Sequence, residues 1–221
     1  MGTDERMATP TDSLTLNQWF SPAFPVGAFA YSHGLEWAIE AGDVQDFAST
    51  SQWIETVLRH GAGWNDAVLL TAAFRADDLA TLERVDATCR ALASSRERLQ
   101  ETSLQGAAFC AALSSVWKAD LKGLSYPVAV GRAAKLEGLP LELTAQFYLQ
   151  AMVTNLASVA MRLVPLGQTD GQMVIRDLTP LCCEIVQRAV QADLEDLSAT
   201  AFLCDIAAMK HETQYSRIFR T

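Results

Sequence analysis

Start and stop signals of helices recur along most of this chain of 221 residues, and no stretch alternates between apolar and polar residues for long enough to form a sheet. Ser94 followed by Glu97 is typical of a capping box at the start of a helix. Gly138 is typical of a helix end, and Pro140 of the first residue of the next helix. No repeat of fixed period and no linker divides the chain. The sequence therefore predicts an all-α, single-domain bundle of about eight to ten helices.

The caps and the apolar spacing place most residues after position 34 in helices. Residues 167–177 are polar and contain glycines, which favours a surface loop. Thr179 with Pro180 favours the start of a helix directly after that loop. The expected helices cover residues 35–41, 47–58, 64–75, 79–92, 94–117, 126–137, 140–164, 179–189 and 193–208.

Two of the expected helices are unusually apolar. Residues 102–117 contain no charged side chain, which predicts a central and mostly buried helix. Residues 147–164 are nearly long enough to span a membrane, but their polar side chains argue for a buried helix of a soluble protein. Four of these polar side chains recur at every fourth residue and form a polar ridge. The favoured interpretation of the ridge is a solvated edge or hydrogen bonding between helices; a water-filled passage or a subunit contact is the alternative. The ridge consists of Gln150, Thr154, Ser158 and Arg162.

The composition excludes several classes of protein. Hydrophobic residues make up 50% of the chain, which is enough for a sizeable core. The formal net charge of −9 argues against binding to nucleic acids or anionic membranes, because these need clustered lysine and arginine. The five cysteines are an odd number and are spread along the chain, which indicates reduced core thiols in a cytoplasmic protein.

The two ends of the chain differ from its middle. Residues 1–13 lack the apolar run of a signal peptide and are expected to be disordered, with Met7 as an alternative start. A helical domain is expected at 14–204. Residues 205–221 are polar, aromatic and locally basic, so they form either a frayed tail or a tail that orders on a partner. Their candidate contact residues are Lys210, His211, Glu212, Tyr215 and Arg217.

The segment from Ser21 to Glu36 holds too many proline, glycine and aromatic residues for an ordinary helix or strand. It is expected to be a defined loop that leads into a helix. Its three large rings belong to Phe24, Phe29 and Tyr31. Each ring must either be buried in its own domain or be presented to a partner, and the sequence leaves both alternatives open.

No catalytic or nucleotide-binding motif stands out. The chain has neither a P-loop nor a nucleophile elbow, so it is not expected to be an enzyme or to bind a nucleotide by itself. His33 and Glu36 are three residues apart and could share one face as part of a metal site or an acid–base pair. A loop histidine beside a first-turn glutamate is the favoured interpretation, because a stable metal centre takes three or four donors.

Four stretches of the sequence, taken together, resemble the family of urease accessory proteins called UreF. They cover nearly the whole chain in the order of the family. They are SPAFPVGAFAYSHGLEWAIEAG at 21–42, YPVAVGRAAKLEGLPLE at 126–142, the GQTDGQ loop at 167–172, and DIAAMKHETQYSRIFRT at 205–221.

This resemblance implies an all-helical, non-catalytic scaffold that binds no cofactor itself. Its expected partners are UreD (UreH in some species), the GTPase UreG and the urease apoprotein, with a UreF homodimer at the centre of the complex. Nickel and GTP would be handled by the partners, and the chain would regulate GTP-dependent insertion of nickel into urease. By resemblance, residues 210–217 form the tail that orders against UreD, with Arg217 as the first choice for supporting the surface used by UreG. Phe29, Tyr31 and Glu36 form the neighbouring part of that surface.

Two alternatives stay open at this point. The chain could be a GTPase-activating protein in the strict sense, with Arg217 supplied in trans to the transition state. It could also be a nickel-binding protein that uses His33, Glu36 and His211, although these offer few ligands.

Overall fold

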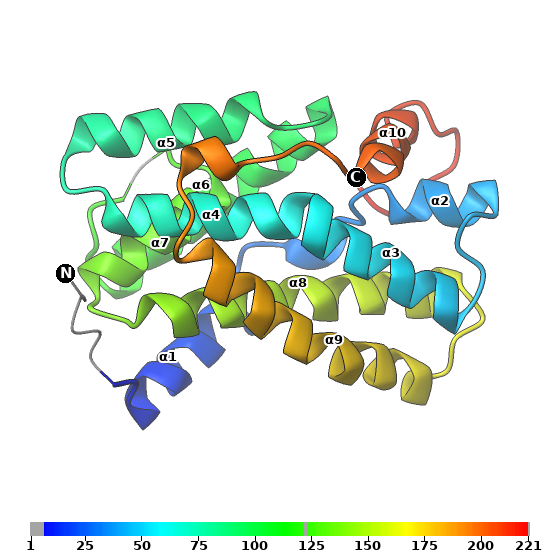
Figure 1. Ribbon diagram of the computed structural model, residues 1–221, viewed down its shortest axis with the longest axis horizontal. Coiled ribbons are helices and arrows are strands. Elements are labelled where there is room, and N and C mark those ends of the chain that lie inside the picture. The colour runs from blue at the N-terminus through cyan, green and yellow to red at the C-terminus, as the bar shows by residue number, and fades with distance from the viewer. Residues whose placement is uncertain (1–6, 122, 221) are drawn as a thin grey trace.

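The computed structural model describes residues 7–121 and 123–220, and these form an all-helical bundle (Figure 1). No strand occurs within these two ranges, so the predicted all-α class is confirmed. The α-helices are α1 (Pro10–Trp19), α2 (Leu35–Ala41), α3 (Phe47–His60), α4 (Ala62–Arg75), α5 (Leu79–Ala91), α6 (Arg96–Val116), α7 (Tyr126–Leu136), α8 (Leu141–Leu163), α9 (Gln168–Ala189) and α10 (Phe202–His211). Two short 3-10 helices, η1 (Ala28–Ala30) and η2 (Leu194–Asp196), join them.

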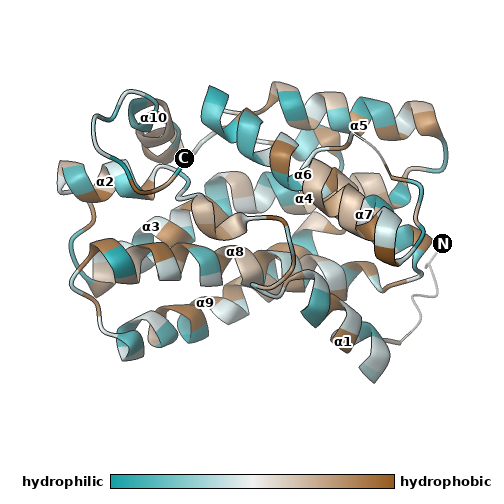
Figure 2. Ribbon diagram, turned by 180° about the vertical axis from the view of Figure 1, so that it is seen from behind, coloured by the Kyte–Doolittle hydropathy of each residue, from teal (hydrophilic) through white to brown (hydrophobic). Residues whose placement is uncertain are grey.

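The bundle is organised around α4 and α8. Helices α3 and α4 follow one another across the molecule and lie alongside α8 and α9, as Figure 1 shows. Helix α7 packs against both α4 and α6, and it is largely apolar in Figure 2, in keeping with this enclosed position. Helices α2 and α10 pack against each other at one end, near the C-terminus.

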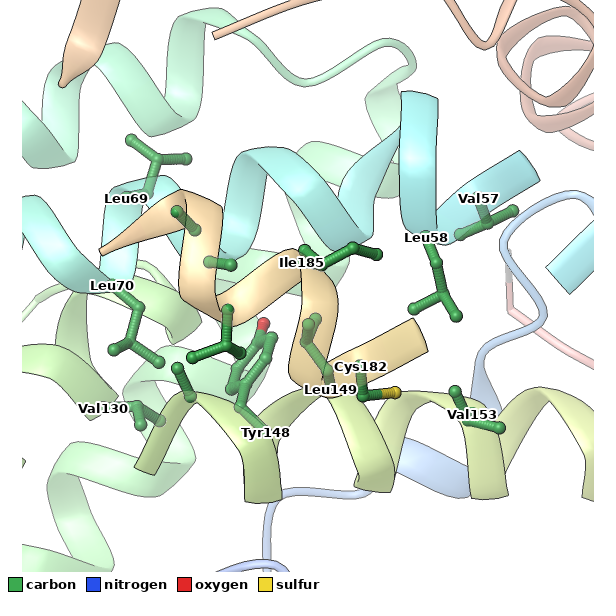
Figure 3. Close-up of a cluster of buried hydrophobic side chains, with 14 of the residues drawn as sticks. Val57, Leu58, Leu69, Leu70, Val130, Tyr148, Leu149, Val153, Cys182 and Ile185 are labelled. Carbon is green, nitrogen blue, oxygen red and sulfur yellow. The ribbon is translucent and has the colours of Figure 1, made fainter. Parts of the chain in front are cut away.

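The core forms where α4, α8 and α9 meet (Figure 3). Leu70 from α4, Leu149 and Val153 from α8, and Ile185 from α9 are fully buried and lie along the space between these helices. Burial of such side chains stabilises a fold by about 1.5–3 kcal/mol each. Within the described ranges, no helix is both long enough and apolar enough to cross a lipid bilayer.

Side chains of the polar ridge of α8 contact other parts of the same chain. The hydroxyl of Thr154 donates to the carbonyl oxygen of Gln150, and the side-chain oxygen of Gln150 accepts a bond of 3.2 Å from Thr179 on α9. Arg162 lies over the ring of Phe219, 5.8 Å from its centroid. The prediction of hydrogen bonding between helices is therefore confirmed for Gln150.

The cysteines are free thiols, as predicted. Cys89, Cys110, Cys182 and Cys204 are buried, and Cys183 is partly exposed. Burial raises the pKa of the Cys89 thiol to about 11 and that of Cys182 to about 12. A buried thiol with so high a pKa is a poor nucleophile, because the reactive form is the thiolate.

The predicted loop at 167–177 is wrong, since these residues form the cap and the first half of α9. Gly167 donates its backbone N–H to Asp170 at 3.0 Å, and the helix continues through Pro180. The expected start at Thr179 and Pro180 is therefore wrong as well. The buried residues Gly171, Val174, Leu178, Leu181 and Ile185 recur at spacings of three and four. This stripe continues across the proline, but it is narrow, and the polar outer face hides it in the sequence.

The prediction of a single helix at 193–208 is also wrong. Asp193 caps only the short η2 helix, and residues 197–201 follow in an irregular conformation before α10 begins. Side chains of α4 hold this stretch in place. Trp64 donates to the carbonyl oxygen of Asp196 at 2.9 Å, and Asn65 exchanges two hydrogen bonds with the backbone of Ser198. Contacts with a distant helix thus replace local helical bonds.

Two smaller differences concern α1 and α6. Helix α1 begins at Pro10, within the segment expected to be disordered, and its N-cap Thr9 forms a capping box with Asp12. Residues 1–6 of that segment lie outside the described residues. Helix α6 is capped by Ser95 rather than Ser94, and it is buried on one face only, since Leu104 and Val116 on it are exposed.

Gly131 on α7 lies against the backbone of α4, and its substitution tests this packing. A Cβ atom at this position would lie 2.2 Å from the carbonyl oxygen of Leu70, a backbone atom that cannot turn away. We expect Gly131→Ala to lower the free energy of unfolding by about 3 kcal/mol in urea denaturation, because the two helices must separate. Gly167→Ala is the control and costs about 1 kcal/mol or less, since its nearest neighbour would lie at 3.5 Å. Equal losses in both variants would contradict this account.

Candidate functional site

The three aromatic rings of the segment 21–36 have different environments. Phe24 is buried, with its ring centroid 5.6 Å from that of Phe109 and 6.3 Å from that of Trp117. Tyr31 is buried, and burial raises the pKa of its hydroxyl, an effect that Arg220 partly offsets. Phe29, in η1, is 64% exposed. The segment therefore contributes two rings to the interior and presents one on the surface.

A turn at His33 and Gly34 brings the segment against α10. Both residues have positive φ angles, 54° and 75°, and Gly34 is the N-cap of α2. A Cβ atom at Gly34 would lie 2.6 Å from the backbone nitrogen of Ala208. Residue 34 must therefore be glycine both for the turn and for the contact with α10.

His211, at the end of α10, joins two carboxylates from distant helices. The imidazole is fully buried. Its Nδ1 lies 2.7 Å from Oε2 of Glu97 on α6, and its Nε2 lies 3.1 Å from Oε2 of Glu36 on α2. Arg217 donates to the other oxygen of Glu97 at 2.5 Å. We refer to Glu36, Glu97, His211 and Arg217 as the histidine cluster.

The histidine cluster fixes the residues that follow α10. Glu36 accepts the backbone N–H groups of Ile218 at 2.6 Å and of Phe219 at 2.9 Å. The side chain of Phe219 is buried, and Arg220 donates its backbone N–H to the carbonyl oxygen of Ala30 at 2.7 Å. The C-terminal segment, residues 202–220, is thus folded back onto α2, α6 and η1.

This segment presents several exposed apolar side chains among exposed polar ones. Tyr215 is fully exposed, and Ile218 is 72% exposed although its backbone N–H is bonded to the buried Glu36. Phe29 adds an exposed ring from η1. We refer to these three residues and the exposed apolar side chains of α10 as the C-terminal face, of which Phe202, Ile206 and Met209 also line a cavity described below. The α10 members are Phe202, Leu203, Ile206 and Met209.

A second group of buried ionisable side chains lies beside the first. Arg98 forms an ion pair with Glu101 one turn further along α6, and Glu101 also lies 3.1 Å from Nε2 of His33. Burial acts to raise the pKa of Glu101, but Arg98 and His33 outweigh it and lower this pKa to about 2. Burial raises the pKa of Asp66, whose carboxyl accepts a hydrogen bond of 2.8 Å from Tyr148.

A cavity of about 340 Å³ lies beneath α10. His60, Cys89, Arg98 and Cys204 are among its lining residues. The described residues contain no group of three or more His, Cys, Asp or Glu side chains arranged to hold a metal ion. His33 contacts Glu101 and Arg98, whereas Glu36 and His211 contact each other.

The structure brings together some of the residues singled out in the sequence. Glu36, His211 and Arg217 share the histidine cluster. Glu212 accepts the backbone N–H of Arg96 at 2.7 Å and so joins the same segment to α6. Lys210 and Tyr215 are exposed. Because Phe24, Tyr31, Glu36 and His211 are buried, they can affect a partner only through the surface that they support.

Sequence reasoning missed the residues of α6 that complete both groups. Glu97 was expected to serve a local capping box, but its carboxylate accepts from His211 and Arg217 instead. The charges of Arg98 and Glu101 resemble an ordinary solvated helix face in the sequence. The one available signal was their position directly before the uncharged stretch at 102–117.

Comparison with known proteins identifies the family. The family model UreF matches residues 44–179. A "Urease accessory protein UreF" from Ruegeria pomeroyi is 62% identical over 217 residues, which are 97% of this chain and 100% of the relative. The chain belongs to the UreF family of urease accessory proteins.

Further UreF relatives match nearly the whole chain. A protein of this name from Roseobacter denitrificans is 52% identical over 219 residues, 98% of this chain and 97% of the relative. Another, from Rhodopseudomonas palustris, is 45% identical over 218 residues, 93% of this chain and 91% of the relative. The resemblance drawn from the sequence motifs is confirmed, and the C-terminal face belongs to a UreF protein.

Substitution of Gly34 tests how α10 packs against the turn at residues 33 and 34. Gly34→Ala places a methyl group against the backbone of Ala208, so we expect α10 to detach and trypsin to cleave after Lys210 at least about tenfold faster. Gly27→Ala is the matched control, because Gly27 has a similar φ of 71° but nothing within 4 Å of its Cβ position. The Gly27→Ala variant has the same strain of an alanine at positive φ, but its methyl group contacts no neighbouring atom. Equally fast cleavage in both variants would show that strain alone, and not contact with α10, accounts for the effect.

Removal of the Arg98 guanidinium tests the buried ion pair. We expect Arg98→Met to lower the free energy of unfolding by about 3–5 kcal/mol at pH 7, because Glu101 loses its cation in a buried site. The folded-state pKa of Glu101 is about 2, below its ordinary 4.5, so this carboxylate stabilises the wild type above pH 4.5 and loses its effect as the pH falls toward 2. The deficit of the variant should therefore shrink as the pH falls from about 4.5 toward 2.

Arg59→Met is the control for this experiment. Arg59 pairs with Glu55 and Glu184, whose side chains are about half exposed, so its loss should cost less than about 1 kcal/mol. Chemical denaturation at several pH values measures both variants. A deficit of Arg98→Met that does not change with pH would contradict the assigned role of Glu101.

Proposed function

We propose that this UreF-family chain is a non-catalytic scaffold that joins UreD (UreH) and the GTPase UreG on urease apoprotein. In this role it regulates the GTP-dependent insertion of nickel into urease. Nickel and GTP are handled by the partners, and the chain acts in the cytoplasm. Family membership supports the general role in urease maturation, and the C-terminal face supports the more specific one.

The observation that carries the proposal is an ordered C-terminal segment that presents exposed apolar side chains. Tyr215 and Ile218 are exposed while the neighbouring Phe219 is buried. Exposed aromatic and apolar side chains on a fixed backbone are typical of a binding surface, because little further ordering is needed on binding. The chain also lacks a P-loop, which agrees with nucleotide binding by a partner.

The candidate residues have two different roles in this proposal. Phe29, Lys210, Tyr215 and Arg217 reach the surface and would contact a partner directly. The buried Phe24, Tyr31, Glu36 and His211 would hold that surface in place, and Glu212 would tie it to α6. The exposed apolar side chains of α10 offer a helix face for the proposed homodimer.

Arg217 favours the scaffold over a strict GTPase-activating protein. Its guanidinium is paired with Glu97 and contacts the backbone of His211, and its side chain is 41% exposed. An arginine that acts in a partner's transition state must leave such a pair first. We therefore assign Arg217 to anchoring the segment and shaping the surface.

Alanine variants separate direct contact from support. Tyr215→Ala removes an exposed ring, and we expect it to weaken co-purification of UreG by about tenfold or more without changing the stability of the chain. Arg217→Ala should weaken it as well, with faster proteolysis of the C-terminal segment. Leu79→Ala, on α5, removes another exposed apolar side chain and should leave recruitment unchanged.

Deletion of residues 205–221 completes the test. We expect this deletion to abolish recruitment of UreD and UreG, and retention of both would exclude the C-terminal segment as their binding site. Single-turnover hydrolysis of GTP by UreG, with and without Arg217→Ala, distinguishes the two roles of this arginine. A loss of the chemical rate in a complex that still assembles would favour the strict GTPase-activating protein.

A further inference from the structure

The imidazole of His211 meets a carboxylate at each ring nitrogen, and this limits where protons can reside. Glu97 lies 2.7 Å from Nδ1 and Glu36 lies 3.1 Å from Nε2. Neutral imidazole donates from only one of its nitrogens, whereas imidazolium donates from both. One additional proton is therefore required among these three groups.

The other contacts of the two carboxylates place this proton on the ring. Both oxygens of Glu36 accept backbone N–H groups, from Ile218 and Phe219. The second oxygen of Glu97 accepts from the guanidinium of Arg217. Carboxylates that accept hydrogen bonds at both oxygens are stabilised in their ionised form. The geometry thus fits two carboxylates, one imidazolium and one guanidinium, whose charges balance.

Other ionisable groups do not supply a substitute for this proton. Glu40 binds Gln214, and Arg96 pairs with Glu212 at the periphery. Lys210 is exposed, and His60 lines the cavity beneath α10. Loss of the proton would leave a net negative charge in a buried site and a ring nitrogen facing a carboxylate without a hydrogen atom between them. Such an arrangement is costly away from water.

We propose that His211 is a proton-dependent anchor of the C-terminal segment. Docking of residues 202–220 takes up one proton at His211, and deprotonation of this ring releases the segment. The C-terminal face is then presented at lower pH and withdrawn at higher pH. Its consequence for UreD and UreG rests on the proposed function, whereas docking itself is a property of the chain alone.

The sign of the effect follows from the two states of the ring. The released ring lies in water without either carboxylate beside it, so it gives up its proton more readily than the docked ring does. The docked ring keeps its proton, so the docked state binds more protons than the released state and docking weakens as the pH rises. Where the two states differ by one proton, the ratio of docked to released chain falls by up to about tenfold per pH unit.

Nitrogen NMR of the histidine rings in the full chain tests the protonation state directly. At pH 7.5 we expect both ring nitrogens of His211 to carry hydrogen in the docked state. In parallel, hydrogen exchange of residues 202–220, corrected for the intrinsic rate and referenced to α8, should lose protection between pH 6.5 and 8.5. A neutral His211 tautomer in the docked state, or protection that does not change with pH, would overturn the proposal.

Glu97→Gln provides a variant that keeps the ring. The glutamine amide can donate to Nδ1 of a neutral imidazole, and its oxygen can still accept from Arg217. We expect this variant to remove most of the pH dependence of docking. Glu212→Gln, which changes a peripheral carboxylate of the same segment, is the matched control and should keep the dependence. An unchanged pH dependence in Glu97→Gln would overturn the proposal even if a His211→Ala chain fails to fold.

Co-purification across the same pH range separates this inference from the proposed function. Loss of docking together with loss of UreG recruitment at high pH supports both. Proton-dependent docking with constant recruitment supports the anchor and contradicts the role of the C-terminal face. Docking that does not depend on pH contradicts the anchor, whatever the recruitment.

Discussion

Buried carboxylates that need partners determine how the end of the chain meets the bundle. Glu36, Glu97 and Glu101 lie on inward faces of α2 and α6, where an unpaired negative charge would be costly. Arg98 and His33 serve Glu101, but Glu36 and Glu97 find their partners in the last turn of α10 and beyond. The bundle therefore requires the C-terminal segment for its own electrostatic balance, and the position of the exposed C-terminal face follows from that requirement.

The segment 21–36 connects the buried carboxylate of Glu36 to the apolar core. Phe24 fixes one end of the segment among aromatic rings, and the turn at Gly34 turns the chain into α2 so that Glu36 faces inward. Between these points η1 presents Phe29 and offers the carbonyl oxygen of Ala30 to Arg220. A single loop thus contributes to the core, to the histidine cluster and to the surface.

The sequence predicted features that depend on neighbouring residues and failed where distant residues decide. The helices expected from residues 47 and 79 begin at those positions, where Asp46 and Asp78 are the N-caps, because an N-cap satisfies donors within the next turn. Residues 167–177 were misassigned because their buried stripe is apparent only once α8 lies against it. Residues 197–201 were misassigned because Asn65 and Trp64 take up backbone groups that a helix would otherwise use.

The candidate site was predictable in part for the same reason. The composition of residues 21–36 and 205–221 marked both as unusual, and the family motifs marked them as related. Their physical connection through Glu97 could not be read from the sequence, because Glu97 fits a local capping pattern equally well. Burial of Tyr31 and exposure of Phe29, two residues apart, likewise depend on how η1 packs against α8.

The separation of the cluster residues along the chain has a consequence for folding. Glu36 and His211 are 175 residues apart, and Glu97 and His211 are 114 apart. Contacts of such long range form late, since loop closure must be completed before they contribute stability. The C-terminal face can therefore take shape only after α2 and α6 have reached their places. Assembly with other proteins through this face would then act as a checkpoint that admits completely folded chains and leaves partly folded ones unbound.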